Sequence, residues 1–189
     1  MTGSWLRRAG ALICLGLLGA CSAIPLSTMA AFSTFQESDF AKLDPHVLRV
    51  RISVPAGYAL DMDSVRLKVS VASGGKSRSE AFTLRTVAET HESKPGGWLS
   101  PATPVITTTC ALAQASEPAF RELQRFVSSG RTESVALDVS LSLSAAPPGA
   151  TAATAWVDVL LEPRQGYVTL VDGATLPLNA TRVYGRKAE

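Results

Sequence analysis

Histidine and cysteine, the side chains most often used for catalysis and metal binding, are scarce in this 189-residue chain. The two histidines, His46 and His91, have no second ligand at the spacing of a zinc site, and no Gly-x-Ser-x-Gly motif accompanies them. Asp61 and Asp63 lack the further carboxylates and the glycine of a calcium loop. The sequence therefore predicts no metal site, no cofactor and no catalytic residues.

An excess of charge of one sign is also missing. The chain has 18 basic and 16 acidic side chains, and Arg7 and Arg8 at the N-terminus account for the whole difference. A domain that binds nucleic acid usually carries a clear basic excess. The balance of charges therefore predicts a protein without a nucleic-acid partner.

No apolar run is long enough for an ordinary transmembrane helix. The uncharged run from Ala9 to Ala20 spans roughly 18 Å as a helix, whereas a bilayer core is about 30 Å thick. A short apolar run after Arg7 and Arg8 is typical of a secretory signal peptide. Twin-arginine export is the alternative, although the residues around the arginine pair match that signal poorly.

The end of this run, Leu18-Gly19-Ala20-Cys21, resembles the lipobox of bacterial lipoproteins. The resemblance implies that residues 1–20 are removed, and that Cys21 carries a thioether-linked diacylglycerol and an acyl chain, such as palmitate, on its new amino group. Ser22 stands where an aspartate would retain such a protein in the inner membrane. We therefore expect a lipid anchor in the outer membrane on its periplasmic face, with the inner membrane as the alternative.

The third cysteine, Cys110, is expected to be a buried, unreactive side chain. Cys14 lies in the predicted signal peptide and Cys21 is the predicted lipid site, so no partner remains for an intramolecular disulfide. The surrounding residues are threonines and small apolar residues, and they give no hint of the electropositive setting that activates a thiol.

Residues 21–45 are predicted to join the lipid to the domain. Apolar residues recur there every three positions, which is compatible with a helical stripe or with a segment lying along the domain surface. An ordinary disordered linker is the alternative. The recurring residues are Leu26, Met29, Phe32 and Phe35.

Residues 46–181 are predicted to form a single domain, with a frayed tail at 182–189. Apolar and polar residues alternate with a period of two, and runs of Gly, Pro and Asp separate the alternating stretches, as in antiparallel β-structure. We expect an antiparallel β-sandwich or a partly open barrel, with Asp172-Gly173 as the turn of a tight hairpin near its end. The expected strands cover 47–54, 65–71, 80–88, 134–143, 155–162 and 167–171, and the threonine-rich stretch 103–109 is a further candidate.

One helix is predicted near 117–128. Ser116 is suited to cap its start, Pro118 to its first turn and Gly130 to its end. An apolar face is expected to pack over a sheet face or to close one end of the sandwich. That face consists of Phe120, Leu123, Phe126 and Val127.

The outward positions of the first two expected strands carry four cations. If those strands pair, the cations share one face and form a possible contact for an anionic lipid or polysaccharide. The alternative is a mixed lattice of charges, in which Asp138 and Asp158 from other strands lie among them. The cations are Arg49, Arg51, Arg66 and Lys68.

These observations favour a non-enzymatic accessory lipoprotein that binds or positions another envelope component, with an envelope protein as the expected partner. The alternative is a carrier of a hydrophobic ligand or lipid, with the helix at 117–128 as its lid and an apolar cavity beneath it. An unidentified periplasmic hydrolase would require converging acidic residues, which the sequence does not reveal.

Overall fold

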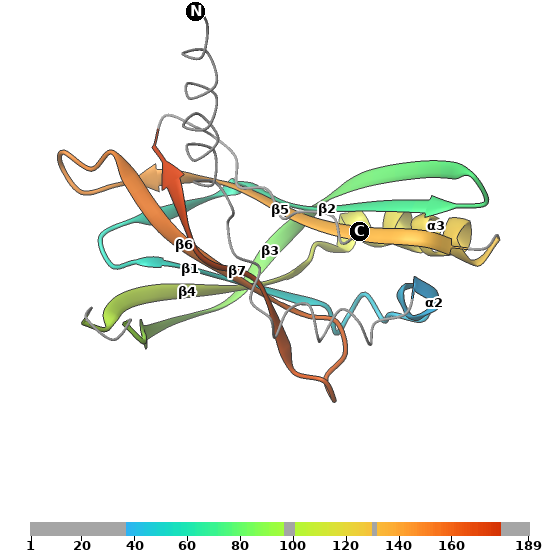
Figure 1. Ribbon diagram of the computed structural model, residues 1–189, viewed down its shortest axis with the longest axis horizontal. Coiled ribbons are helices and arrows are strands. Elements are labelled where there is room, and N and C mark those ends of the chain that lie inside the picture. The colour runs from blue at the N-terminus through green and yellow to red at the C-terminus, as the bar shows by residue number, and fades with distance from the viewer. Residues whose placement is uncertain (1–36, 97–100, 130–131, 179–189) are drawn as a thin grey trace, which may run out of the picture.

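The computed structural model describes residues 37–96, 101–129 and 132–178. Its seven antiparallel strands form a curled half-barrel sheet in the order β5-β2-β3-β4-β1-β6-β7 (Figure 1). The predicted fold class is therefore confirmed. The strands are β1 (Arg49–Pro55), β2 (Ala59–Ser73), β3 (Lys76–Lys94), β4 (Thr103–Leu112), β5 (Thr132–Ala145), β6 (Ala152–Leu160) and β7 (Tyr167–Pro177).

The core lies on the concave face of this sheet because apolar residues occupy alternate positions of the strands. In β6, for example, buried positions alternate with half-buried ones along the whole strand, and Val157 and Val159 are fully buried. Cys110 of β4 is also buried in this core, as expected.

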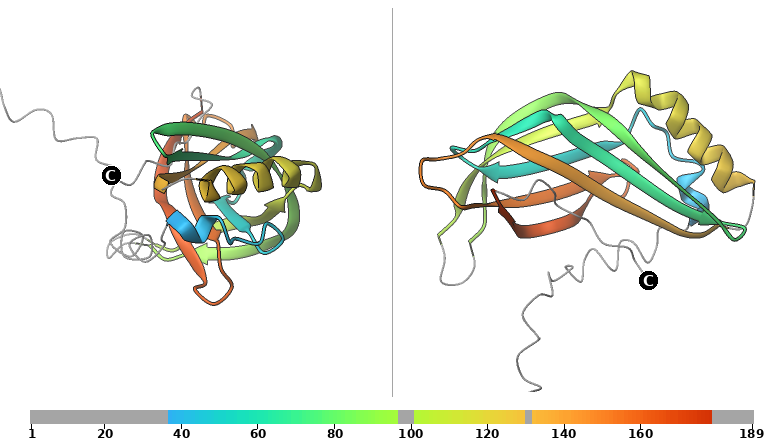
Figure 2. Two further views of the ribbon diagram at one scale, coloured as in Figure 1. Left: turned by 90° about the vertical axis from the view of Figure 1, so that its right-hand side faces the viewer. Right: turned by 90° about the horizontal axis from the view of Figure 1, so that it is seen from above.

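The predicted helix is present with the predicted boundaries, as α3 (Glu117–Ser128), and a 3₁₀ turn at Gln114–Ser116 precedes it. It lies across one end of the curled sheet (Figure 2). Phe120 and Leu123 of α3 are fully buried, and the Phe120 ring lies 5.3 Å from the rings of both Phe40 and Phe82. Aromatic side chains thus fill the space directly beneath α3, and this packing gives no support to a lid over a ligand cavity.

The packed unit includes residues before the predicted start at 46. A short helix, α2 (Glu37–Phe40), places Phe40 in the core. The buried Gln124 of α3 donates hydrogen bonds from Nε2 to the carbonyl oxygens of Phe40 and Leu43, at 3.0 and 2.7 Å. Several positions with predicted roles lie outside the described residues: Cys21, the apolar stripe from Leu26 to Phe35, Gly130 and the tail at 182–189.

The prediction of a hairpin at Asp172-Gly173 is wrong. These residues lie inside β7, which pairs with β6 on both sides of a register shift opposite Trp156. Gly173 has φ of +70°, so it supplies the left-handed conformation of a bulge rather than that of a turn. A bulge and a hairpin both favour Asp-Gly, which explains the error.

Ser116 stands at the predicted N-cap position of α3, but the predicted cap hydrogen bond is absent, and the strand predicted at 80–88 is longer than expected. The hydroxyl of Ser116 makes no cap hydrogen bond to the helix and instead accepts one from the backbone N–H of Thr83 on β3, at 3.1 Å. β3 extends beyond the predicted limit at 88 to Lys94, and it includes His91. Beyond Leu84, the described residues pair β3 with β4 alone, so 85–93 are exposed on both faces.

Candidate anion-binding site

The four predicted cations do not come together by pairing of the first two strands. β3 and β4 lie between β1 and β2 in the sheet, which separates the two strands by roughly 14 Å. β1 and β2 are therefore not paired, and that pairing was the condition for all four cations to share one face.

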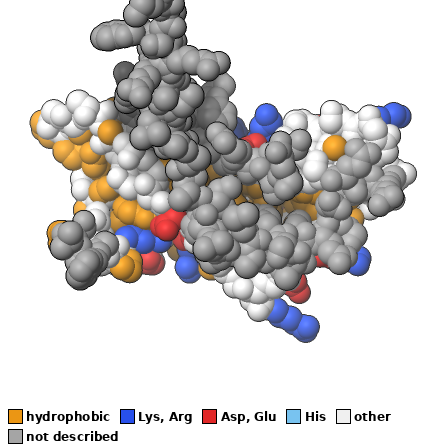
Figure 3. Space-filling model, in the orientation of Figure 1, with side chains coloured by type: hydrophobic (Ala, Val, Ile, Leu, Met, Phe, Trp, Pro, Cys, Tyr) orange, Lys and Arg blue, Asp and Glu red, His pale blue; other side chains and the backbone are white. Residues whose placement is uncertain are grey.

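Two of these cations have acidic neighbours on the outer face. Arg51 is the cross-strand partner of Asp158, and its guanidinium lies 3.7 Å from the centre of the Tyr167 ring. Lys68 is the cross-strand partner of Asp138. On the face of the molecule that Figure 3 presents, positive and negative side chains lie beside one another. Around Arg51 and Lys68, the surface is thus the mixed lattice that was the alternative prediction.

The two acids of this lattice have different surroundings. Asp158 accepts a hydrogen bond from the Thr169 hydroxyl at 2.7 Å and forms an ion pair with Lys94 at 3.6 Å. Burial raises the pKa of Asp138, and the charge of Lys68 opposes that rise without cancelling it. Both acids therefore lie next to cations, Asp158 beside Arg51 and Lys94, and Asp138 beside Lys68.

The other two cations are joined by an arginine that was not predicted. Arg85 of β3 and Arg49 of β1 both face Ala111 of β4 in register, so they lie on one face with a single alanine between them. Arg66 of β2 faces Thr83, two residues before Arg85, and such diagonal neighbours are about 7–8 Å apart. We call these three arginines, Arg49, Arg66 and Arg85, the basic row.

Local hydrogen bonds fix two members of the basic row. Arg49 donates from one terminal nitrogen to the carbonyl oxygens of His46 and Leu48, at 2.6 and 2.8 Å. Arg66 makes the equivalent bonds to Asp63 and Val65, at 2.7 and 2.8 Å. Each guanidinium keeps further N–H groups for other acceptors. Arg85 is exposed and, within the described residues, forms no ion pair.

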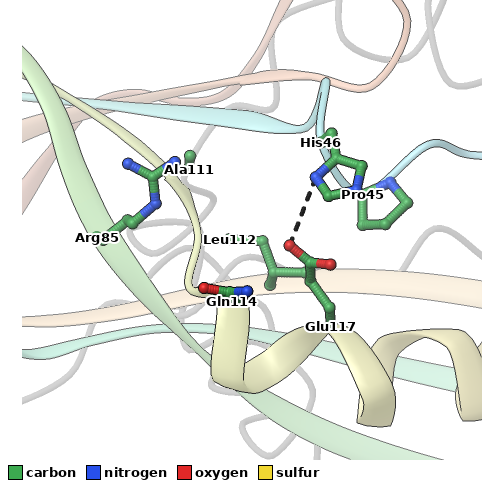
Figure 4. A pocket seen from close by; sticks show the side chains of 7 residues that line it. All are labelled: Pro45, His46, Arg85, Ala111, Leu112, Gln114 and Glu117. Atoms are coloured by element: carbon green, nitrogen blue, oxygen red, sulfur yellow. Dashed lines mark ion pairs between the residues drawn. The ribbon is translucent and has the colours of Figure 1, made fainter.

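A depression of about 400 Å³ adjoins the basic row at Arg85 (Figure 4). Ala111 and Leu112 of β4 line it between the loop before β1 and the start of α3. His46 and Glu117 approach each other across it, with 3.4 Å between imidazole Nδ1 and carboxylate Oε1. The remaining lining residues are Pro45, Arg85 and Gln114.

The chemistry of this depression is that of anion binding. It offers the guanidinium of Arg85 and the imidazole of His46, with the guanidinium of Arg49 beside it, against the single carboxylate of Glu117. Among the described residues that line it, none is a serine, threonine or cysteine that could act as a nucleophile. Within residues 37–96, 101–129 and 132–178, no group of three or more His, Cys, Asp or Glu side chains is placed to hold a metal ion.

The residues that sequence reasoning missed here are Arg85, Gln114 and Glu117. The alternation in 80–88, with Phe82 and Leu84 inward, already places Arg85 on the outer face. What was lacking was the strand order, which brings Arg85 between Arg66 and Arg49. Glu117 forms its ion pair with His46, which precedes β1, and no local pattern around position 117 indicates that distant partner.

No protein-family model, curated protein or solved structure matches this chain. Across the part of the chain that the structure describes, no helix combines the length and apolar character needed to span a bilayer.

Proposed function

We propose that this protein is a lipid-anchored, non-enzymatic accessory of the bacterial cell envelope, which holds an anionic envelope component against the basic row. The lipobox-like segment ending at Cys21 supports the anchor, and Ser22 supports the periplasmic face of the outer membrane as its location. The observation that carries the binding role is the alignment of Arg66, Arg85 and Arg49 across three strands of one outer face.

The charges in the basic row favour a partner rather than internal stabilisation. Aligned like charges repel one another and lower stability unless acids lie among them. Arg51 and Lys68, on the same two strands as Arg49 and Arg66, each have an acid as cross-strand partner. In the basic row the residues directly opposite are Ala111, Thr83, Ser140 and Leu160, which carry no charge. Asp138 and Asp158 are diagonal neighbours of Arg66 and Arg49, but each lies directly opposite another cation, Lys68 or Arg51.

Photo-crosslinking in intact cells tests this function. A photoreactive amino acid at Gln114, which is exposed at the rim of the depression, should capture an envelope component. The same group at Lys76, which is exposed at the start of β3 and about nine residues before Arg85, should not. Capture from position 114 should disappear when the three arginines are replaced by glutamine.

Two results would contradict the proposal. One is capture of the same species from position 76 as from position 114. The other is capture from position 114 that is unchanged in the triple variant Arg49→Gln, Arg66→Gln, Arg85→Gln, since binding would then not depend on the basic row.

A further inference from the structure

We infer that the depression beside the basic row binds a phosphomonoester group, with Arg85 as its main ligand. This inference rests on the proposed function and specifies the anion that it recognises. Arg49 and His46 flank the site, and the small side chain of Ala111 lies between Arg85 and Arg49.

The charge of the site matches a dianion better than a carboxylate. Arg85 and Arg49 each contribute one permanent positive charge, because a guanidinium stays protonated in proteins. The carboxylate of Glu117 lies 3.4 Å from the imidazole of His46, so it faces His46 rather than the arginines. A phosphomonoester carries a charge of about −1.5 to −2 at pH 7, which compensates both arginines, whereas a carboxylate compensates one.

The geometry also favours phosphate. The fork of N–H donors on arginine fits two oxygens of one phosphate, and Arg85 has no ion-pair partner within the described residues that occupies it. The hydrogen bonds from Arg49 to the His46 and Leu48 carbonyls hold its guanidinium close to the backbone segment that carries His46. The site is therefore partly ordered before a ligand arrives, which lowers the entropy cost of binding.

The depression is large enough for more than the phosphate itself. Small-molecule sites are commonly about 300–1,000 Å³, and this one is about 400 Å³. Pro45, Ala111 and Leu112 supply apolar surface next to the charged groups. This arrangement suits a phosphate attached to a carbon-containing group, such as a sugar or a lipid headgroup.

Calorimetric titration of the full-length acylated protein in a neutral detergent at pH 7.5 tests the inference. Phenyl phosphate should bind, and benzoate should bind at least about fivefold more weakly. Arg85→Gln should weaken phenyl phosphate at least about tenfold, the loss expected for a charge-assisted hydrogen-bonded contact. Arg85→Lys, which keeps the charge but not the fork, should give an intermediate value.

The matched control is Arg125→Gln, which makes the same substitution at an exposed position of α3, about 12 Å along the helix from Glu117. It should bind phenyl phosphate like the unchanged protein. Equal binding by Arg85→Gln and Arg125→Gln would overturn the inference, and so would equal affinity for benzoate and phenyl phosphate.

A second ligand distinguishes the source of the phosphate. Dihexanoyl phosphatidic acid carries the same monoester on a short lipid. Tighter, Arg85-dependent binding of this lipid assigns the site to a lipid headgroup, and equal affinity assigns it to a soluble or glycan-borne phosphate. If neither ligand binds while charge-dependent crosslinking from position 114 persists, the phosphomonoester assignment is wrong and the proposed function stands.

Discussion

Burial in the core suppresses the reactivity of the Cys110 thiol. The side chain is fully buried, and burial raises the pKa of the thiol to about 11. Only about one thiol in a thousand is then ionised at pH 8, and the thiolate is the reactive form. We expect iodoacetamide to leave Cys110 unmodified in the folded protein at pH 8 and to modify it after denaturation, as measured by mass spectrometry of the tryptic peptide. Comparable labelling of folded and denatured protein would contradict this.

Cys110 should also make the free energy of unfolding decrease as the pH becomes alkaline. A group whose folded-state pKa is raised contributes stability that is complete below its unfolded pKa and is lost as the pH rises through the folded value. For Cys110 this window runs from about pH 9 to about 11. In urea unfolding, the unchanged protein should lose on the order of 2 kcal/mol more across this window than Cys110→Ala does.

The pKa of Asp138 is governed by burial more than by the charge of the neighbouring cation. Asp138 is half-buried, and burial raises its pKa more than Lys68 lowers it. Its contribution to stability is therefore full below about pH 4, where the unfolded carboxyl is also protonated, and is lost as the pH rises through the raised folded value. We expect Asp138→Asn to be more stable than the unchanged protein at pH 7, with the difference disappearing near pH 3.

Urea unfolding at both pH values measures this effect, with Asp172→Asn at an exposed site as the control for a simple change in net charge. A variant at position 138 that is less stable than the unchanged protein at pH 7 would show that the attraction of Lys68 exceeds the cost of burial.

At the scale of the element, the bulge in β7 depends on Gly173. Its φ is +70°, and a Cβ atom there would lie 3.3 Å from Nε1 of Trp156. Gly166 has a similar φ of +76° but no atom within 4 Å of the same position. We expect Gly166→Ala to cost about 1–2 kcal/mol through backbone strain alone, and Gly173→Ala to cost more. Thermal unfolding of the two variants isolates the Trp156 contact, and equal losses would show that Trp156 moves aside freely.

Gln124 connects two elements that are distant in sequence. Its side-chain amide satisfies the carbonyls of Phe40 and Leu43, and it is 8% exposed. Gln124→Leu leaves two acceptors without this donor, so we expect a loss of about 1–3 kcal/mol. Limited proteolysis should also cut near residues 40–45 sooner than in Arg125→Leu, which places the same side chain at an exposed site. Unchanged protease resistance would mean that Phe40 alone anchors the segment.

How far the sequence predicts these elements depends on whether the signal is local. Local patterns indicate at least part of each strand, since alternation marks six of them and the threonine-rich stretch 103–109 marks β4. Pro118 together with the apolar face locates α3 in the same way, because these patterns are properties of neighbouring residues. The bulge at Gly173 and the bond from Thr83 to Ser116 depend on pairing partners far away in the chain. The basic row belongs to the same category, since alternation gives the outward face of Arg85 but not its neighbours on β2 and β1.

For the whole molecule, the proposed anchor limits how far the domain can lie from a membrane. The core begins at Phe40, 19 residues after Cys21. A fully extended chain covers at most about 3.6 Å per residue, so the tether would hold Phe40 within roughly 70 Å of the lipid. A basic row held at this range would meet envelope components near the membrane rather than across the whole periplasm.

This limit depends on acylation at Cys21, which mass spectrometry of the protein from its native membrane tests directly. We expect the N-terminal peptide to begin at Cys21 and to carry a diacylglycerol and an amide-linked acyl chain, since two or more chains are needed for stable anchoring. Cys21→Ser should retain residues 1–20, whereas Cys14→Ser, a change within the predicted signal peptide, should leave processing unaltered. An unmodified residue 21 with residues 1–20 still attached would contradict the lipid anchor. It would also contradict the proposal that the basic row acts close to a membrane.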